Sequence, residues 1–339
     1  MRAVSDAGTM RAAFFDRARS MEVREVPVPV PGPDEVRLRV QYCGICGSDV
    51  SLYKTGALAG PDVVLGHEVS ATVDQDPSGR LRPGSRVTPF PARGCGTCVF
   101  CRDGHWRFCL DPPAEVGGGF AEFTVYPARN LIPVPSALDD RRAAAAEPLG
   151  VALRGVELAA PSPGDLAYVS GLGSIGLFTL AGLVQAGCRV VGADPNPDRR
   201  VVAEGLGAEA VFDNTVRDPA ATMRSFDPRG PRVAFECAGV PASLEEVIET
   251  CGHLGVIGIL GIPMAPVLLL RMTIKEQRAF SISGPSPDSM RRAVDLLRER
   301  PQVGDVITGT ATLEGMGAAM EALAEGRGGI KVLVDPRAG

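Results

Sequence analysis

The stretch LAYVSGLGSIG, residues 166–176, begins with an apolar run typical of a buried β-strand and continues with glycines in the order GxGxxG. An apolar segment of helical character follows. In such a unit the first glycine makes a tight turn, the second lets the backbone approach a pyrophosphate, and the third lets the helix pack on the strand. The first N–H groups of the helix would face the phosphates. We therefore expect a dinucleotide to be bound by Gly171, Gly173, Ser174, Ile175 and Gly176.

Further apolar runs follow this loop, separated by segments of helical character. Strands that alternate with helices predict an α/β fold with a doubly wound parallel sheet. The expected strands after the loop are residues 189–193, 211–213, 233–237 and 256–260.

Asp194 follows the second strand of this region, near the spacing at which an acidic residue binds the adenosine ribose hydroxyls. A carboxylate at this place repels a 2′-phosphate, so the sequence favours NAD over NADP as the cofactor. Arg199 lies close by, and NADP therefore stays an alternative cofactor, because an arginine there can hold the 2′-phosphate. The alternative for Asp194 is a simple turn residue before Pro195.

The chain on either side of this sheet has a different pattern. Residues 10–150 are rich in Val, Pro and Gly, with short alternating runs that indicate strands, and residues 1–9 precede them as an extension. After the segment SGPSP (283–287), we expect a helix at 288–299, a strand at 306–311, a helix at 314–326 and a strand at 330–334. We expect residues 151–284 to be the sheet domain, with residues 10–150 and 285–339 forming the other domain.

Four cysteines lie within fifteen residues, with the spacing C-x2-C-x2-C-x7-C. Four thiolates suit a tetrahedral Zn²⁺ ion and leave no position for a substrate, so the expected role is structural. An iron–sulfur cluster also takes four thiolates, but the spacing favours zinc. His105 lies inside the loop and is expected at the surface. The expected ligands are Cys95, Cys98, Cys101 and Cys109.

Three more residues of metal-binding type are spread over the first 150 residues: Cys46 in GICGSD, His67 in GHE, and Glu147 at the start of a helical segment. One thiolate, one imidazole and one carboxylate make the open three-ligand set of a catalytic zinc. Each residue alone would also fit a core cysteine, a satisfied histidine or a surface carboxylate. The glycine next to Cys46 favours it over Cys43, because it allows close approach of the backbone to an ion.

The bulk composition excludes several classes of function. A net charge of −5 with both signs interspersed offers no basic face for nucleic acid. No apolar run reaches the length of about 20 residues that crosses a membrane. The N-terminal stretch lacks the apolar core of a secretory signal, and nine cysteines with four at metal spacing suit a reducing compartment. We therefore expect a cytoplasmic protein.

With these motifs, the chain resembles the zinc-dependent medium-chain dehydrogenases, the family of alcohol, sorbitol and threonine dehydrogenases, over about residues 10–336. The resemblance implies a GroES-like, mostly-β catalytic domain and a Rossmann domain, with the active site in the cleft between them. It also implies two zinc ions per chain and a homodimer or homotetramer. The motifs are GICGSD (44–49), GHE (66–68), the four-cysteine loop, EPLGVAL (147–153), GLGSIG (171–176) and IKVLVDP (330–336).

The resemblance also assigns roles. Cys46 and His67 match catalytic zinc ligands, and Glu68 matches the carboxylate beside them. Glu147 matches the glutamate that approaches zinc in polyol dehydrogenases, directly or through water. Which of the two glutamates binds the metal stays open. Ser48 matches the residue that takes the proton of the substrate hydroxyl.

Two positions depart from the pattern of the family. Many relatives have a histidine where this chain has Ser51, so proton relay would run through Ser51, cofactor hydroxyls or water. Relatives commonly have histidine or asparagine where this chain has Arg154. Its cation would meet a substrate or cofactor oxygen, or lie on a solvated helix surface.

The implied reaction is hydride transfer from a secondary alcohol to NAD(P), which gives a ketone. Few aromatic residues, 5%, favour a polar pocket for a polyol, sugar or (amino)cyclitol. GSDVSLYKTG (47–56) is similar to dehydrogenases of aminocyclitols in aminoglycoside antibiotic biosynthesis, such as 2-deoxy-scyllo-inosamine dehydrogenase. The alternatives are a threonine or simple-alcohol dehydrogenase, a zinc-free reductase of activated alkenes, and a non-enzymatic NAD-binding structural protein.

Overall fold

The computed structural model describes residues 8–56, 62–112, 118–264, 266–267 and 269–338. The chain forms two compact units. The first contains the chain up to Glu147 together with Ala293–Glu299 and the segment from Ile307 onward, and the second contains Pro148–Arg292 and Arg300–Val306. Most of the extension at residues 1–9 lies outside the described residues. In the described part of the chain, no helix has the length and apolar character to cross a membrane.

The second unit is built on parallel strands, which are β9 (Leu166–Ser170), β10 (Arg189–Ala193), β11 (Ala210–Phe212), β12 (Val233–Glu236), β13 (Val256–Ile259) and β14 (Arg278–Ser281). Within the described residues they form one six-stranded sheet in the order β11-β10-β9-β12-β13-β14. Numbered from β9, this is 3-2-1-4-5-6, the order of a Rossmann sheet. The parallel sheet expected from the sequence is confirmed.

Helix α4 (Ala146–Ala159) precedes the first of these strands. The helices between the strands are α5 (Ser174–Gln185), α6 (Pro197–Gly205), α7 (Pro219–Phe226), α8 (Pro241–Thr250) and α9 (Leu269–Lys275). Helix α5, which starts in the glycine loop, is apolar on nearly all sides and buried from Gly176 to Leu183. The helix α10 (Pro287–Glu299) and the short 3₁₀ helix η3 (Pro301–Val306) lead back to the first unit.

The strand β14 is the element of this sheet that sequence patterning missed. It is an edge strand, paired on one side with β13, and most of its residues are exposed. An edge strand needs no continuous apolar run, so RAFS carried no signal that would separate it from a loop.

The first unit is mostly β. Its strands are β1 (Thr9–Arg17), β2 (Ser20–Pro27), β3 (Glu35–Gly44), β4 (Val63–Val64), β5 (Glu68–Gln75), β6 (Arg86–Pro89), β7 (Phe123–Pro127), β8 (Leu131–Pro133), β15 (Ile307–Ala311) and β16 (Lys331–Val334). In the described ranges they form a three-stranded sheet, β2-β1-β4, and a seven-stranded sheet, β15-β16-β3-β5-β6-β8 with β7 beside β3. Its helices are α1 (Gly47–Thr55), α2 (Val99–Arg102), α3 (Asp140–Ala143) and α11 (Met316–Ala324), with 3₁₀ turns η1 (Trp106–Phe108) and η2 (Ala128–Asn130).

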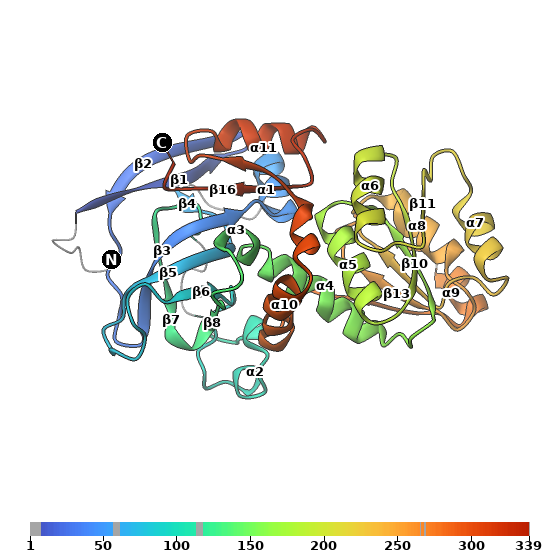
Figure 1. Ribbon diagram of the computed structural model, residues 1–339, viewed down its shortest axis with the longest axis horizontal. Coiled ribbons are helices and arrows are strands. Elements are labelled where there is room, and N and C mark those ends of the chain that lie inside the picture. Colours follow the sequence, from blue (N-terminus) through green and yellow to red (C-terminus); the bar gives the residue numbers. More distant parts are fainter. Residues whose placement is uncertain (1–7, 57–61, 113–117, 265, 268, 339) are drawn as a thin grey trace. The chain divides into compact units, whose positions relative to one another are not determined.

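The C-terminal segment is part of this first unit. Figure 1 shows α11 and β16, in red, beside the blue N-terminal strands. The strand β16 pairs antiparallel with the end of β3, with Val334 opposite Cys43. This pairing brings residue Lys331, near the end of the chain, to the turn that follows β3.

Candidate functional site

Strand pairing brings together two of the sequence motifs. The strands β3 and β5 are antiparallel, and Gly44 at the end of β3 lies opposite Glu68 at the start of β5. Cys46 follows β3 and precedes α1, and His67 precedes β5. Cys46 Sγ, one ring nitrogen of His67 and one carboxylate oxygen of Glu68 all lie within 4.8 Å of one another. This donor set and its spacing fit one zinc ion.

Asp49 supports both segments of this cluster, although it had no role in the sequence analysis. Its Oδ2 accepts a hydrogen bond from Cys46 N at 2.9 Å, and its Oδ1 lies 3.8 Å from His67 Nδ1. A carboxylate beside one ring nitrogen of a metal-binding histidine orients the ring and leaves the other nitrogen for the ion. The sequence signal was an acidic residue in the first turn of α1.

The cluster is rich in negative groups. Burial raises the pKa of Asp49. Burial alone would lower the pKa of His67, but Asp49 and Cys46 outweigh that effect and raise this pKa well above its ordinary value. A group of thiol, imidazole and carboxyl side chains that together favour positive charge is suited to a divalent cation.

Lys331 is the second supporting residue that sequence reasoning missed. Its Nζ lies 2.8 Å from both carboxylate oxygens of Glu68 and donates to Ile45 O at 2.9 Å. Lys331 and Glu68 are 2% and 0% exposed, so this is a fully buried ion pair. Burial would lower the pKa of Lys331, but the Glu68 carboxylate reverses this and raises it. The ammonium therefore ties the residue before Cys46 to the residue after His67.

Glu147 lies in the first turn of α4 and has a different environment. It is 5% exposed. Burial raises its pKa to about 7; the charge of Glu68 adds to the rise, whereas His67 and Lys331 oppose it. Glu68 thus bonds an ammonium directly, whereas His67, Lys331 and Arg107 act on Glu147 through their charges and lower its pKa against the effect of burial.

The remaining first-unit candidates lie on α1. Ser48 and Ser51 are both exposed, and the backbone carbonyl of Ser51 accepts a hydrogen bond from Thr55. Arg154 lies in the second unit. It is half-buried, and its Nη1 donates to Gly284 O at 3.0 Å, which joins α4 to the segment before α10.

The four cysteines between residues 95 and 109 form a separate cluster. Zinc–sulfur bonds of about 2.3 Å place the sulfurs of a tetrahedral site about 3.8 Å apart. The structure has 3.9 Å between the sulfurs of Cys95 and Cys101 and 4.0 Å between those of Cys98 and Cys109. The cluster therefore fits a closed Cys₄ zinc site. His105 beside it is exposed.

Hydrogen bonds prepare two of these thiols for a metal. The hydroxyl and N–H of Thr97 donate to Cys95 Sγ, which lowers the pKa of Cys95 to about 6. A backbone hydrogen bond from Leu110 lowers the pKa of Cys98, whereas burial raises that of Cys101 to about 12. Low thiol pKa values favour the thiolate form that binds metal.

The GxGxxG loop in the second unit has the backbone that a pyrophosphate needs. Gly171 has a φ of 88°, and a Cβ there would lie 2.6 Å from Ala238 N. A Cβ on Gly176 would collide with the carbonyl of Gly171, whereas one on Gly173 would meet nothing within 4 Å. Close packing thus leaves no room for a side chain at the first and third glycines. The second leaves space in front of α5, where free N–H groups can receive phosphate.

Asp194 lies against this loop. It is 3% exposed, and its carboxylate accepts hydrogen bonds of 2.8 Å from Leu172 N and Asn196 N. Arg199 Nη1 lies 3.4 Å from Asp194 Oδ2. The carboxylate is therefore held beside the glycine loop, with one guanidinium next to it.

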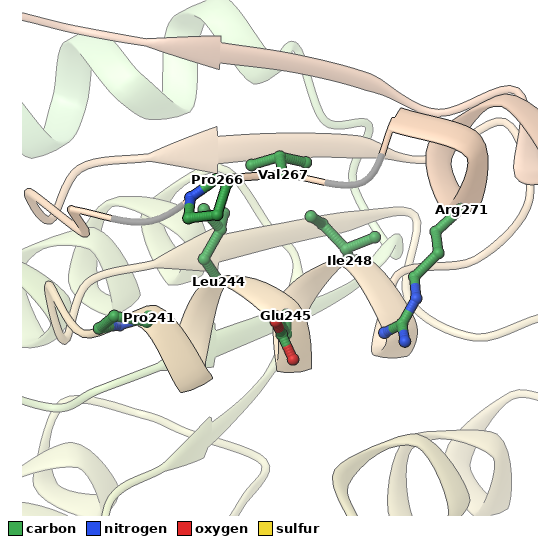
Figure 2. Close-up of a pocket in the computed structure, with 7 residues that line it drawn as sticks. All are labelled: Pro241, Leu244, Glu245, Ile248, Pro266, Val267 and Arg271. Carbon is green, nitrogen blue, oxygen red and sulfur yellow. The ribbon is translucent and has the colours of Figure 1, made fainter.

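Figure 2 shows a pocket in the second unit, between α8 and the segment before α9. Its volume of about 150 Å³ is small for a dinucleotide, since ligand pockets typically measure about 300–1,000 Å³. None of the residues predicted to bind cofactor, metal or substrate lines it. The lining residues are Pro241, Leu244, Glu245, Ile248, Pro266, Val267 and Arg271.

Comparisons with known proteins agree with this architecture. The family model described as an alcohol dehydrogenase GroES-like domain matches residues 32–136, and the one described as a zinc-binding dehydrogenase matches residues 174–299. Sorbitol dehydrogenase of Gallus gallus is 31% identical over 288 residues, 79% of this chain and 80% of that protein. L-threonine 3-dehydrogenase of Pyrococcus horikoshii is 31% identical over 252 residues, 71% of this chain and 72% of that protein.

A solved structure is similar over nearly the whole chain. A zinc-binding dehydrogenase from Sinorhizobium meliloti 1021, bound to NADP, has a TM-score of 0.87 and 29% identity. The similarity covers 97% of this chain and 100% of that chain. The GroES-like and Rossmann folds expected from the sequence are confirmed.

Proposed function

Because the chain belongs to the zinc-dependent medium-chain dehydrogenases, the family of the alcohol dehydrogenases, we propose that it oxidises a secondary hydroxyl of a polyol, sugar or (amino)cyclitol to a ketone. It is an enzyme that acts on CH–OH donors with zinc and a nicotinamide cofactor. The observation that carries the proposal is the open cluster of Cys46, His67 and Glu68. A closed set of four protein ligands would leave a substrate no place at the metal.

In the proposed site, Cys46, His67 and Glu68 hold a catalytic zinc, with Glu147 beside them. Zinc bound there would act as a Lewis acid that lowers the pKa of the substrate hydroxyl. Asp49 holds the His67 ring, and Lys331 holds Glu68. The second zinc would be structural, on the four cysteines between residues 95 and 109.

Two serine side chains on α1 could carry the proton of the substrate hydroxyl to solvent. Ser48 follows Cys46 by two residues on α1 and is exposed, so its hydroxyl can accept the substrate proton and pass it to water. Ser51, one turn further along α1, is exposed as well and offers a second hydroxyl where relatives have histidine.

For the cofactor we propose NAD in preference to NADP. Gly171, Gly173, Ser174, Ile175 and Gly176 would bind the pyrophosphate, and Asp194 the adenosine ribose. A 2′-phosphate would meet the Asp194 carboxylate, although Arg199 at 3.4 Å offsets part of the repulsion.

The cofactor preference gives a prediction. Asp194→Asn removes the negative charge and keeps one acceptor oxygen for Leu172 N, although its NH₂ then faces Asn196 N, so the NAD:NADP ratio of kcat/KM should fall about tenfold. Arg199→Ala should raise the same ratio, because the cation that would hold a 2′-phosphate is lost. Steady-state kinetics with both cofactors measures the ratios. Asp198→Asn, an exposed change on the same helix, is the control and should leave the ratio unaltered. An unchanged ratio in both test variants would contradict the assignment.

The narrower substrate that we propose is an aminocyclitol, oxidised at a ring hydroxyl within aminoglycoside antibiotic biosynthesis, as 2-deoxy-scyllo-inosamine dehydrogenase does. GSDVSLYKTG (47–56) and EPLGVAL (147–153) support this choice. Glu147, a buried carboxyl beside the proposed metal site, is a group that could receive the amino group of such a substrate. By family analogy we also propose a homodimer or homotetramer. The two domains would have different roles. The alcohol would be bound by residues 10–150 with 285–339, and the cofactor by residues 151–284.

A substrate screen tests the proposal. The purified enzyme is incubated with NAD or NADP and with cyclitols, aminocyclitols, polyols, threonine and simple alcohols, and NAD(P)H formation is recorded. We expect the highest kcat/KM with a polyol or with a cyclitol or aminocyclitol. Activity confined to simple aliphatic alcohols, or to threonine, would contradict the proposed substrate class. Reduction of activated alkenes alone would contradict the reaction itself.

A further inference from the structure

Glu246 of α8 is the centre of a polar cluster in the second unit. The Tyr168 hydroxyl and the Ser170 hydroxyl each donate to Glu246 Oε1 at 2.6 Å. The side-chain amide of Asn214 donates to Glu246 Oε2 at 2.9 Å. The donors come from β9 and from the loop after β11, so Glu246 joins one strand and one loop of the sheet to α8.

Asn214 has an unpaired group in this cluster. Its NH₂ must face Glu246, because a carboxylate accepts hydrogen bonds and cannot donate them. The carbonyl Oδ1 is therefore turned away from Glu246. This oxygen is buried and has no hydrogen-bond partner among the described residues. Buried acceptors of this kind normally have a partner, so the missing donor needs an explanation.

The cluster lies at the edge of the sheet where the cofactor is expected. Ser170 immediately precedes Gly171 of the dinucleotide loop and pairs with Ala193, the residue before Asp194. Asp194 N in turn donates to Phe212 O at 3.2 Å, two residues before Asn214. Asp194 thus lies between Ser170 at the end of β9 and the loop after β11 that carries Asn214. The adenine base is attached to the ribose that Asp194 would hold, so the base must lie close to this edge.

We propose that Asn214 recognises the adenine base of the cofactor, its Oδ1 accepting a hydrogen bond from the exocyclic 6-amino group. This assignment rests on the proposed function as a nicotinamide-dependent dehydrogenase. Glu246, held by three donors, fixes the amide so that an acceptor and not a donor is presented. Oδ1 is closed to water, so the turn that carries Asn214 must shift as the base enters. The next residues, Thr215 and Val216, are exposed, and the bonds that hold this turn include those of Thr215 to the Asp213 carboxylate.

The test compares NADH with its deamino analogue, in which hypoxanthine presents a 6-oxo acceptor in place of the amine. Isothermal titration calorimetry measures the affinity of the whole enzyme for each. We expect wild-type protein to bind NADH about tenfold more tightly than deamino-NADH, because two acceptors would face each other in the analogue. Asn214→Ala should reduce this discrimination to about twofold or less.

A second variant separates base recognition from disturbance of the cluster. Tyr168→Phe removes one donor to Glu246 but leaves the Asn214–Glu246 bond in place, so discrimination should persist. Thermal melts of both variants establish that they are folded. Equal wild-type affinity for the two dinucleotides, or unchanged discrimination in folded Asn214→Ala, would overturn the role of Asn214 alone. Failure of the wild type to bind either dinucleotide would overturn the proposed function as well.

Discussion

Replacing Cys46 with alanine should lower kcat/KM for alcohol oxidation by on the order of a thousandfold or more, because loss of a metal ligand removes several kcal/mol of transition-state stabilisation. Cys46 supplies the thiol of the three-residue cluster with His67 and Glu68. The dinucleotide loop lies in the other unit of the chain, so NADH affinity should stay within about twofold of the wild type. Steady-state kinetics and calorimetry measure the two effects.

Cys43→Ala is the matched control for this change. Cys43 is three residues away on β3 and fully buried, but it is not part of the cluster. Its replacement removes a small core side chain and should reduce stability without removing turnover. If Cys46→Ala kept wild-type turnover, or if Cys43→Ala abolished it in a folded protein, the open site would have to be placed elsewhere.

Replacing Lys331 with methionine should destabilise the first unit by about 3–5 kcal/mol, the usual cost of leaving one partner of a buried ion pair uncompensated. The Glu68 carboxylate is fully buried and accepts from Lys331 Nζ with both oxygens. Removing the ammonium also leaves Ile45 O without its donor. For a unit of this size the melting temperature should fall by roughly 10 °C.

The measurement is a thermal melt of metal-depleted protein, since a bound cation would itself compensate Glu68. Lys331→Arg should lose less, because it keeps the positive charge. The double variant with Glu68→Gln should recover part of the loss, because no unpaired charge then remains. Lys54→Met, on the exposed side of α1, is the surface control. Equal melting temperatures for wild type and Lys331→Met would show that the buried pair does not hold the cluster together.

Local spacing was sufficient to predict the parts of the molecule that depend on short stretches of chain. The GxGxxG loop and the four-cysteine cluster each lie within about fifteen residues, so their geometry follows from local backbone. Cys46 and His67 are further apart, yet residue chemistry and family resemblance selected both. The structure places them together through the pairing of β3 with β5.

The supporting residues could not be predicted in this way. Lys331 is more than 260 positions from Glu68 in sequence, and only the return of β16 to β3 brings it there. A lysine within an apolar run does not indicate which acidic residue it will pair with. Asn214 and Glu246 are likewise joined through the order of the sheet. Arg154 bonds a backbone carbonyl of its own unit, a contact that no local pattern encodes.

The most direct test of the account is the zinc content of purified wild-type protein and of Cys46→Ala, measured by inductively coupled plasma mass spectrometry. If one zinc ion is bound at Cys46 and His67 and another at the four-cysteine site, the wild type should contain about two zinc ions per chain. The variant should then contain about one. A wild-type protein with no zinc, or a variant that retains both ions, would contradict it.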